Sequence, residues 1–263
     1  MKKIIPVFFL MFGLAFMPFT AGAAPAQTSQ ITPSSAINKA GRQRMLSQRM
    51  VKFYCQIGQG VLADKAAVQM GQSVVLFESQ LDELEQNAPN AEIKTAVAEM
   101  KAAWLPYREV VTAKPTLKGG DQLIDLSETL LKRAHNVTQL WQNAAGTQTG
   151  RLVNISGRQR MLSQRMARFY FEKRRGFRPA EISAGLKQAK EEFTSAMNEL
   201  ESAPQNTPAI RKELEQARNQ WIFFNNAIDQ ADSKDPILAT NVATSSERIL
   251  EVMDKVTGMY EKL

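Results

Sequence analysis

The sequence contains a ten-residue motif rich in hydrogen-bond donors, and it contains this motif twice. Gly-Arg-Gln-Arg-Met-Leu-Ser-Gln-Arg-Met occupies residues 41–50 and returns unchanged at residues 157–166, an offset of 116. Its polar groups are guanidiniums, amides and a hydroxyl, with no carboxylate among them. The complementary ligand is therefore an anion. Planar guanidiniums suit a small planar oxyanion, which each can contact through two N–H groups.

The motif does not have the composition of a catalytic or metal centre. It contains no acid–base pair, no activated nucleophile and no set of metal ligands. The whole chain has one histidine, His135, and one cysteine, Cys55, so we expect no disulfide framework, no His-based catalysis and no zinc site. We therefore predict a protein that is not an enzyme and needs no cofactor. The repeat aligns Cys55 with Phe171, a buried position, and His135 with Asp254, a surface position.

Helical geometry predicts where the arginines of the motif point. At 100° per residue, Leu46, Met50 and Phe53 form an apolar stripe, and Arg44 lies on the opposite side. Arg44 and its counterpart Arg160 therefore point away from the core of their own bundles. If the two motif helices pack together, these guanidiniums converge across a pseudo-two-fold axis. At about 6 Å they would repel by roughly 3 kcal/mol at an effective dielectric near 20, and an anion between them would reverse that sign.

Four residues are the predicted anion contacts, and four neighbours are secondary candidates. One turn before each arginine, a glycine leaves room for a ligand to approach the backbone. The surrounding sequences of the two copies have diverged, whereas the arginines and glutamines of the motif have not. Packing alone would not require this, although a solvated arginine face is the ordinary alternative. The primary contacts are Gly41, Arg44, Gly157 and Arg160, and the secondary ones are Arg42, Gln48, Arg158 and Gln164.

The elements that carry the motif are predicted to be helices of two tandem bundles. Apolar residues recur with a period near 3.6 over segments of roughly 20 to 27 residues, separated by proline and glycine, and no strand alternation is present. Fainter matches extend the repeat along the chain, such as Trp104 with Trp221. We predict an all-α fold of two four-helix up-down bundles, with domains at residues 34–145 and 150–263. Pro106 should kink or break its helix.

The N-terminus is predicted to be an export signal. Lys2 and Lys3 precede an uncharged apolar stretch, and Ala21-Gly22-Ala23 is a cleavage site, so residues 1–23 form a Sec-type signal peptide. No later segment is apolar enough to span a membrane. The formal charge of +7 falls to +5 when the two lysines are removed. We expect a periplasmic protein that meets small anions and other proteins, with nucleic acid excluded as a partner by its location.

The motif in its context resembles a known sensory family. Ile37-Asn38-Lys39-Ala40-Gly41, followed by Arg44, Met45, Ser47 and Arg49, resembles the P-box of the NarX/NarQ nitrate and nitrite sensor kinases. The full decapeptide is similar to the amino-terminal domain of PilJ-type chemotaxis transducers. The resemblance implies a periplasmic four-helix sensor domain. In the nitrate sensors the anion lies on the dimer axis between two P-boxes, and the matching positions here are Gly41, Arg44, Gly157 and Arg160.

Two departures from the family qualify the functional expectation. The chain lacks a kinase or methyl-accepting segment, so it needs a membrane receptor or enzyme as partner. Arg42 and Gln43 stand where the nitrate sensors have Ser-Leu, and the extra cation could favour another anion. We expect a sensor or accessory module for a small oxyanion, nitrate or nitrite first. The alternative is a ligand-free helical docking protein. The motifs could pair within one chain or between the chains of a homodimer.

Overall fold

The computed structural model describes residues 31–230 and 235–263, and these form a single compact unit. The described part of the chain consists of helices and short loops, as the sequence predicts. The eight helices are α1 (Pro33–Gly58), α2 (Ala63–Gln86), α3 (Ala91–Val111), α4 (Leu117–Ala145), α5 (Gln148–Arg175), α6 (Pro179–Glu201), α7 (Pro208–Ile228) and α8 (Pro236–Glu261).

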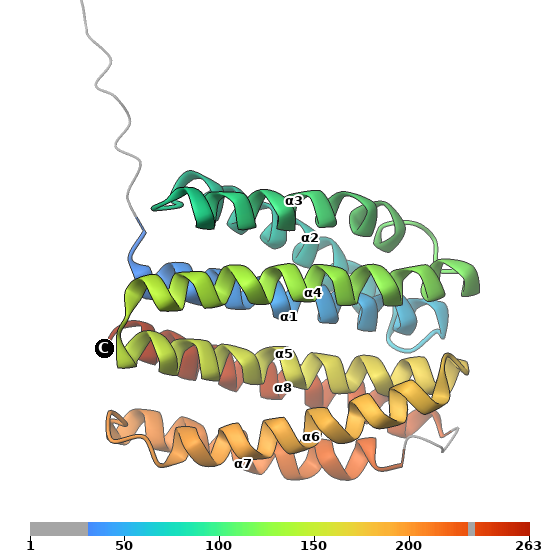
Figure 1. Cartoon of the computed structure of the whole chain (residues 1–263). Coiled ribbons are helices and arrows are strands. Elements are labelled where there is room, and N and C mark those ends of the chain that lie inside the picture. Colours follow the sequence, from blue (N-terminus) through green and yellow to red (C-terminus); the bar gives the residue numbers. More distant parts are fainter. Residues whose placement is uncertain (1–30, 231–234) are drawn as a thin grey trace, which may run out of the picture. The chain divides into compact units, whose positions relative to one another are not determined.

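The helices form two up-down bundles that share a central contact. Helices α1 to α4 make the first bundle and α5 to α8 the second, and α1 packs along α5 over its length (Figure 1). Because three turns of direction separate α1 from α4 and one more precedes α5, α1 and α5 run parallel. The prediction of two tandem four-helix bundles is confirmed. The separate folding of 34–145 and 150–263 stays a prediction.

Polar side chains cap the start of six of the eight described helices, including α5, which begins the second repeat. Helix α4 ends at Ala145, Gly146 takes a left-handed φ of 60°, and the side chain of Thr147 accepts a hydrogen bond from the Gly150 amide to start α5. This two-residue linker, Gly146 and Thr147, leaves α5 antiparallel to α4. The expected interruption at Pro106 is wrong in one respect, because α3 continues unbroken through it. Buried Trp104 and Tyr107 hold both sides of the proline in the core.

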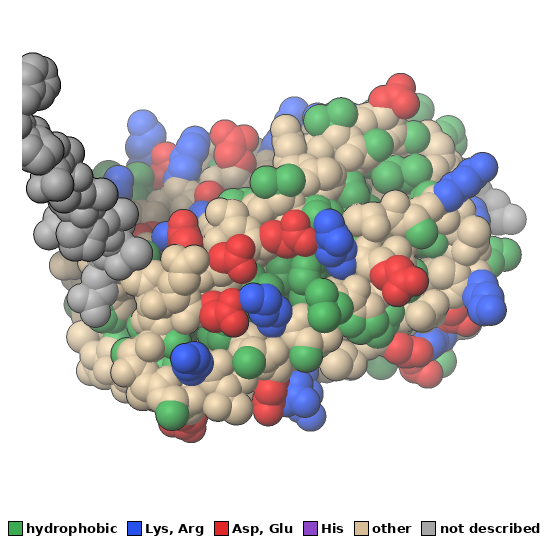
Figure 2. Space-filling view, turned by 90° about the horizontal axis from the view of Figure 1, so that it is seen from above, with side chains coloured by type: hydrophobic (Ala, Val, Ile, Leu, Met, Phe, Trp, Pro, Cys, Tyr) green, Lys and Arg blue, Asp and Glu red, His purple; other side chains and the backbone are tan. Residues whose placement is uncertain are grey.

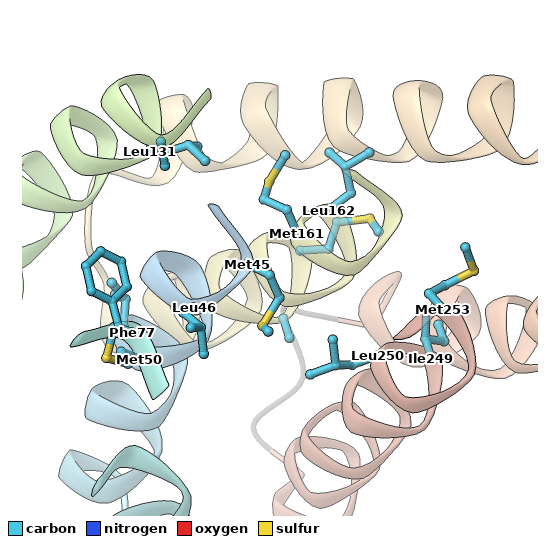
Figure 3. Packing of buried hydrophobic residues seen from close by; sticks show 14 of the residues in the cluster. Met45, Leu46, Met50, Phe77, Leu131, Met161, Leu162, Ile249, Leu250 and Met253 are labelled. Carbon is cyan, nitrogen blue, oxygen red and sulfur yellow. The ribbon is translucent and has the colours of Figure 1, made fainter. Parts of the chain in front are cut away.

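The cores of the two bundles repeat the same aromatic pairing. Phe77 stacks on Trp104 at 4.1 Å, and their counterparts Phe193 and Trp221 stack at 4.5 Å. Figure 3 shows Leu46 and Met50 on α1 near Phe77 of α2, while Met45 extends toward α8. The apolar stripe predicted for the motif therefore faces its own bundle.

The surface of the described region is mixed in charge. Seen over α2 and α3, acidic and basic side chains alternate with apolar patches (Figure 2). Among the described residues, no helix combines the length and apolar character needed to cross a membrane. The predicted signal peptide, residues 1–23, lies outside the described residues.

Candidate functional site

The two predicted arginines meet at the contact between α1 and α5. Arg44 and Arg160 are 1% and 0% exposed, and each crosses to the other repeat. Arg44 Nη2 donates to Asn154 Oδ1 at 2.7 Å and to the Asn154 carbonyl at 3.3 Å, while Arg160 Nη2 makes the same two contacts with Asn38. Helical periodicity therefore placed both side chains correctly, away from their own bundle cores.

The two glycines of the motif lie against these guanidiniums. A Cβ atom at Gly41 would lie 3.2 Å from Nη2 of Arg44 and 3.8 Å from Nη2 of Arg160. At Gly157 the corresponding distances are 3.1 Å to Arg160 and 3.8 Å to Arg44. Both guanidiniums thus converge on the same stretch of bare backbone. All four primary candidates lie together, and their role in binding an anion stays a prediction.

The charge on Arg160 has a carboxylate partner, whereas no described residue supplies a carboxylate to Arg44. Arg160 Nη1 donates to Asp254, which also accepts from Arg42 Nη2 at 2.7 Å. Arg44 Nη1 instead contacts Nδ1 of His135 at 3.3 Å. Burial, then Arg158 and Arg160, lower the pKa of Arg44 to about 9. Burial lowers the pKa of Arg160 to about 10, and Asp254 opposes that shift. Within the described part of the chain, the guanidinium of Arg44 is therefore a buried cation without a carboxylate partner.

His135 is not the surface residue that the repeat predicted. It is half-buried, and burial together with Arg44 and Arg158 lowers its pKa to about 4. The imidazole is therefore neutral at pH 7. Because a guanidinium can only donate, Nδ1 is the acceptor and the ring proton is on Nε2. Its alignment with Asp254, an acid in the other copy, was the one signal that could have singled it out.

The glutamines among the secondary candidates hold the two repeats together. Gln48 Oε1 accepts from Arg168 at 2.7 Å, and Gln164 Oε1 accepts from Lys52 Nζ at 2.7 Å. Lys52 and Arg168 occupy equivalent positions, and both are buried. These two cations were not among the predicted site residues. Each lies eight residues after Arg44 or Arg160, about two turns along the helix and about 80° around it, so the spacing places them on a neighbouring helix face. The side-chain amides of Gln48 and Gln164 therefore form hydrogen bonds that stabilise the fold.

Two grooves flank the paired helices, one for each remaining candidate. The α8 groove, between α1, α2 and α8, has a volume of about 660 Å³ and includes Arg42. The α4 groove, between α4, α5 and α6, has a volume of about 240 Å³ and includes Arg158 together with Arg44. Arg158 Nη2 donates to Glu192 at 2.6 Å. The pseudo-two-fold relation of the helices thus extends to the grooves, but their linings differ.

The described residues offer little for other kinds of chemistry. Within 31–230 and 235–263, no group of three His, Cys, Asp or Glu residues is placed to hold a metal ion. Cys55 is buried in the core, as expected, and burial raises the pKa of its thiol, which keeps it protonated. The paired buried guanidiniums at the α1–α5 contact are the feature that remains for functional interpretation.

Comparison with known proteins identifies the family. The PilJ model, described as "Type IV pili methyl-accepting chemotaxis transducer N-term", matches residues 28–128 and again residues 141–246. No curated protein and no solved structure matches the chain. The resemblance to PilJ and its tandem duplication are confirmed, whereas the specificity of the nitrate sensors stays a prediction. The chain belongs to the PilJ family and carries the family's N-terminal domain twice.

Proposed function

We propose that this protein is an exported sensor or accessory module that binds a small oxyanion, with nitrate or nitrite first, and reports to a membrane-bound partner. The family supports the sensory part, because its description names the N-terminal portion of a chemotaxis transducer. A transducer delivers its signal across a membrane, so a chain that acts only outside needs a receptor or enzyme to do so. The predicted signal peptide at residues 1–23 would place the protein in the periplasm.

The observation that carries the anion proposal is the pair of buried guanidiniums. Arg44 and Arg160 approach the same glycines from opposite repeats. Two buried like charges raise the free energy of the folded state, and a bound anion lowers it. An anion would therefore favour one packing of α1 against α5 over others. A shift between such packings is the signal that a partner could read.

A ligand-free docking protein is the second candidate, and one observation favours it. Nη2 of each arginine already has two acceptors on the opposite asparagine. The central contact is thus largely satisfied without a ligand. In that case the outer helices would serve as a surface for a partner bundle.

Thermal unfolding in the presence of anions separates the two candidates. Nitrate, nitrite, phosphate, sulfate and small carboxylates would be compared at constant ionic strength. An anion at 100 times its dissociation constant should stabilise the protein by about 2.7 kcal/mol, which shifts the melting temperature by several degrees. If the anion lies between the two arginines, Arg44→Ala and Arg160→Ala should both lose the shift.

The variants need a check that loss of binding is not loss of folding. Circular dichroism would confirm the helical content, and Arg44→Lys keeps the charge while removing the planar donor pair. Arg133→Ala is the matched control, because Arg133 forms an exposed pair with Glu99 on the far side of α4. If none of the anions raises the melting temperature of the unmodified protein, the docking function replaces the sensor function.

A further inference from the structure

We propose that the α4 groove is a binding site for one small carboxylate or nitrate-like oxyanion, held by Arg44 where the other repeat uses its own Asp254. The inference rests on the proposed anion binding. It adds where the anion binds, how many anions bind to each chain, and which group of the protein the anion resembles. The anion would lie beside the α1–α5 pair, on the side of Arg44, rather than midway between the two arginines.

The α8 side of the molecule shows what a filled site looks like. There the Asp254 carboxylate accepts hydrogen bonds from Arg160 Nη1 and from Arg42 Nη2. The carboxylate is planar and carries a single charge, and it neutralises a guanidinium that is 0% exposed. The chain therefore supplies one of its two equivalent arginines with a carboxylate of its own, which has the shape and charge of the proposed ligand.

The α4 side has the same arginines but lacks that acid. Arg44 and Arg158 are the counterparts of Arg160 and Arg42, and His135 stands at the position of Asp254. Lys132 lines the α4 groove where the α8 groove has the acid Glu251. Two acids are thus replaced by a neutral imidazole and a cation. No carboxylate in residues 31–230 or 235–263 pairs with Arg44. The Nε atoms of Arg44 and Arg160 both lack a hydrogen-bond partner there, so the missing carboxylate is what distinguishes Arg44.

The acids that do line the α4 groove are committed to other cations. Glu128 accepts from Arg165 Nη2 at 2.9 Å and from Arg168 Nη1 at 2.8 Å. Glu192 accepts from Arg158 at 2.6 Å. The groove therefore keeps an excess of positive charge centred on Arg44 and Lys132. Its volume of about 240 Å³ is several times the ~30 Å³ that one water occupies in the liquid, which is ample for a small oxyanion.

His135 is suited to the role of a replaceable partner. Its contact with Arg44 Nη1 is long, at 3.3 Å, and links a cation to a neutral ring. A guanidinium and an anion attract each other as opposite charges in addition to forming a hydrogen bond, whereas a neutral imidazole supplies the hydrogen bond without that attraction. An incoming oxyanion can therefore displace the imidazole from Arg44. The displaced ring and the newly neutralised guanidinium would change how α4 lies on α5.

An exchange of His135 and Asp254 tests the site. His135→Asp should place a built-in carboxylate on Arg44, raise the melting temperature without added anion, and weaken the binding of sodium nitrate and sodium formate at least tenfold. His135→Asn, the isosteric uncharged variant, should still show an anion-dependent shift. Asp254→Asn should open the equivalent site on Arg160, and calorimetry should then count two anions per chain instead of one.

The outcomes separate this inference from the proposed function. If His135→Asp binds nitrate and formate as tightly as the unmodified protein, the α4 groove is not the site, although oxyanion binding stands. If His135→Asp loses binding while Arg160→Ala keeps it, the groove is supported and the shared site between the two arginines is wrong. If the unmodified protein binds neither anion, both proposals fail. Circular dichroism on each variant excludes unfolding as the cause.

Discussion

At the scale of single residues, the molecule places one chemical group in two different surroundings. Arg44 and Arg160 belong to identical decapeptides and are equally buried, yet one faces a neutral imidazole and the other a carboxylate. A buried cation without a counter-ion costs free energy, which a fold tolerates when the group has a further role. The difference between the two arginines therefore comes from α4 and α8, and not from the motif itself.

The motif glycines provide a prediction at this scale. A Cβ at Gly41 would lie 3.2 Å from Arg44 Nη2, so Gly41→Ala should displace that guanidinium by a few tenths of an ångström. Alanine is also the better helix former by about 1 kcal/mol. We therefore expect Gly41→Ala to weaken anion binding while the unfolding free energy stays level or rises. Calorimetric titration and chemical denaturation would measure the two effects.

Gly71→Ala on α2 is the control for Gly41→Ala, since a Cβ there would have no neighbour within 4 Å. Gly71→Ala should raise the unfolding free energy and leave the anion affinity unchanged. Equal anion affinities in the two variants would contradict the idea that the bare backbone at Gly41 positions the guanidinium.

At the scale of elements, α1 and α5 are joined by buried ion pairs at equivalent places. Lys52 Nζ donates to Glu247 at 2.5 Å and to Gln164, while Arg168 donates to Glu128 and Gln48. Lys52 and Arg168 thus each link their own helix to the last helix of the other repeat. Each also contacts the motif on the other central helix. These contacts fix the register of α1 on α5, which sets the positions of Arg44 and Arg160 two turns earlier.

The acidity of Glu247 gives a prediction about pH. Burial opposes its ionisation, but Lys52 and Arg49 together hold its pKa at about 2. Its ordinary pKa is near 4.5, so the ionised carboxylate stabilises the folded state above that pH, and this stabilisation is lost as the pH falls toward 2. We expect the unfolding free energy to drop by roughly 2 kcal/mol from this group over that interval. Denaturant titrations at pH 5, 4 and 3 would measure it.

Glu247→Gln should be less stable than the unmodified protein at pH 7, and its stability should depend less on pH below 5. Glu251→Gln is the matched control, because Glu251 is exposed on the same helix and pairs with Lys255 at 3.8 Å. If the unfolding free energy of Glu247→Gln falls with pH as steeply as that of the unmodified protein, other carboxylates cause the fall.

At the scale of the whole molecule, the two repeats pack together as the two subunits of a dimer would, although they belong to one chain. Helices α1 and α5 lie parallel and are related by a pseudo-two-fold axis (Figure 1). The contacts of Arg44 with Asn154 and of Lys52 with Gln164 are repeated by those of Arg160 with Asn38 and of Arg168 with Gln48. Asp254 and His135 are the groups that differ. The second repeat therefore offers the first a near copy of its own surface. Because the two copies are in one chain, the grooves beside Arg44 and Arg160 can have different linings.

An isolated first repeat should consequently form a homodimer. In a dimer of residues 31–146, Lys52 would meet Gln48, Ser127 and Glu128 of the second copy, which are equivalent to Gln164, Ser246 and Glu247. Light scattering should give twice the fragment mass. Because neither Arg44 would face an acid, nitrate or formate should strengthen this dimer. A folded monomer would instead support independent domains at 34–145 and 150–263.

Much of this arrangement could be predicted from the sequence, because it depends on local periodicity and on the repeat. The period of 3.6 residues identified the helices, the spacing of glycine and proline identified the loops, and the angular position of Arg44 on its helix indicated that it faces away from its own core. The repeat then predicted that Arg44 and Arg160 behave alike. The inferences from periodicity and spacing concern residues within a few helical turns of each other, and the repeat extended them to the second copy.

Only the tertiary structure decided which groups neutralise the two arginines. The partners of Arg44 lie 91 and 110 residues away in the chain, on α4 and α5. Helical periodicity describes a face relative to the core of its own bundle, so it assigned His135 and Asp254 to the surface. Because α1 packs on α5, each motif lies at the contact between the two bundles. The helix faces that carry His135 and Asp254 contact the arginines there. The difference between the two arginines therefore comes from the side chains that α4 and α8 place beside them, which only the packing of whole helices brings into contact.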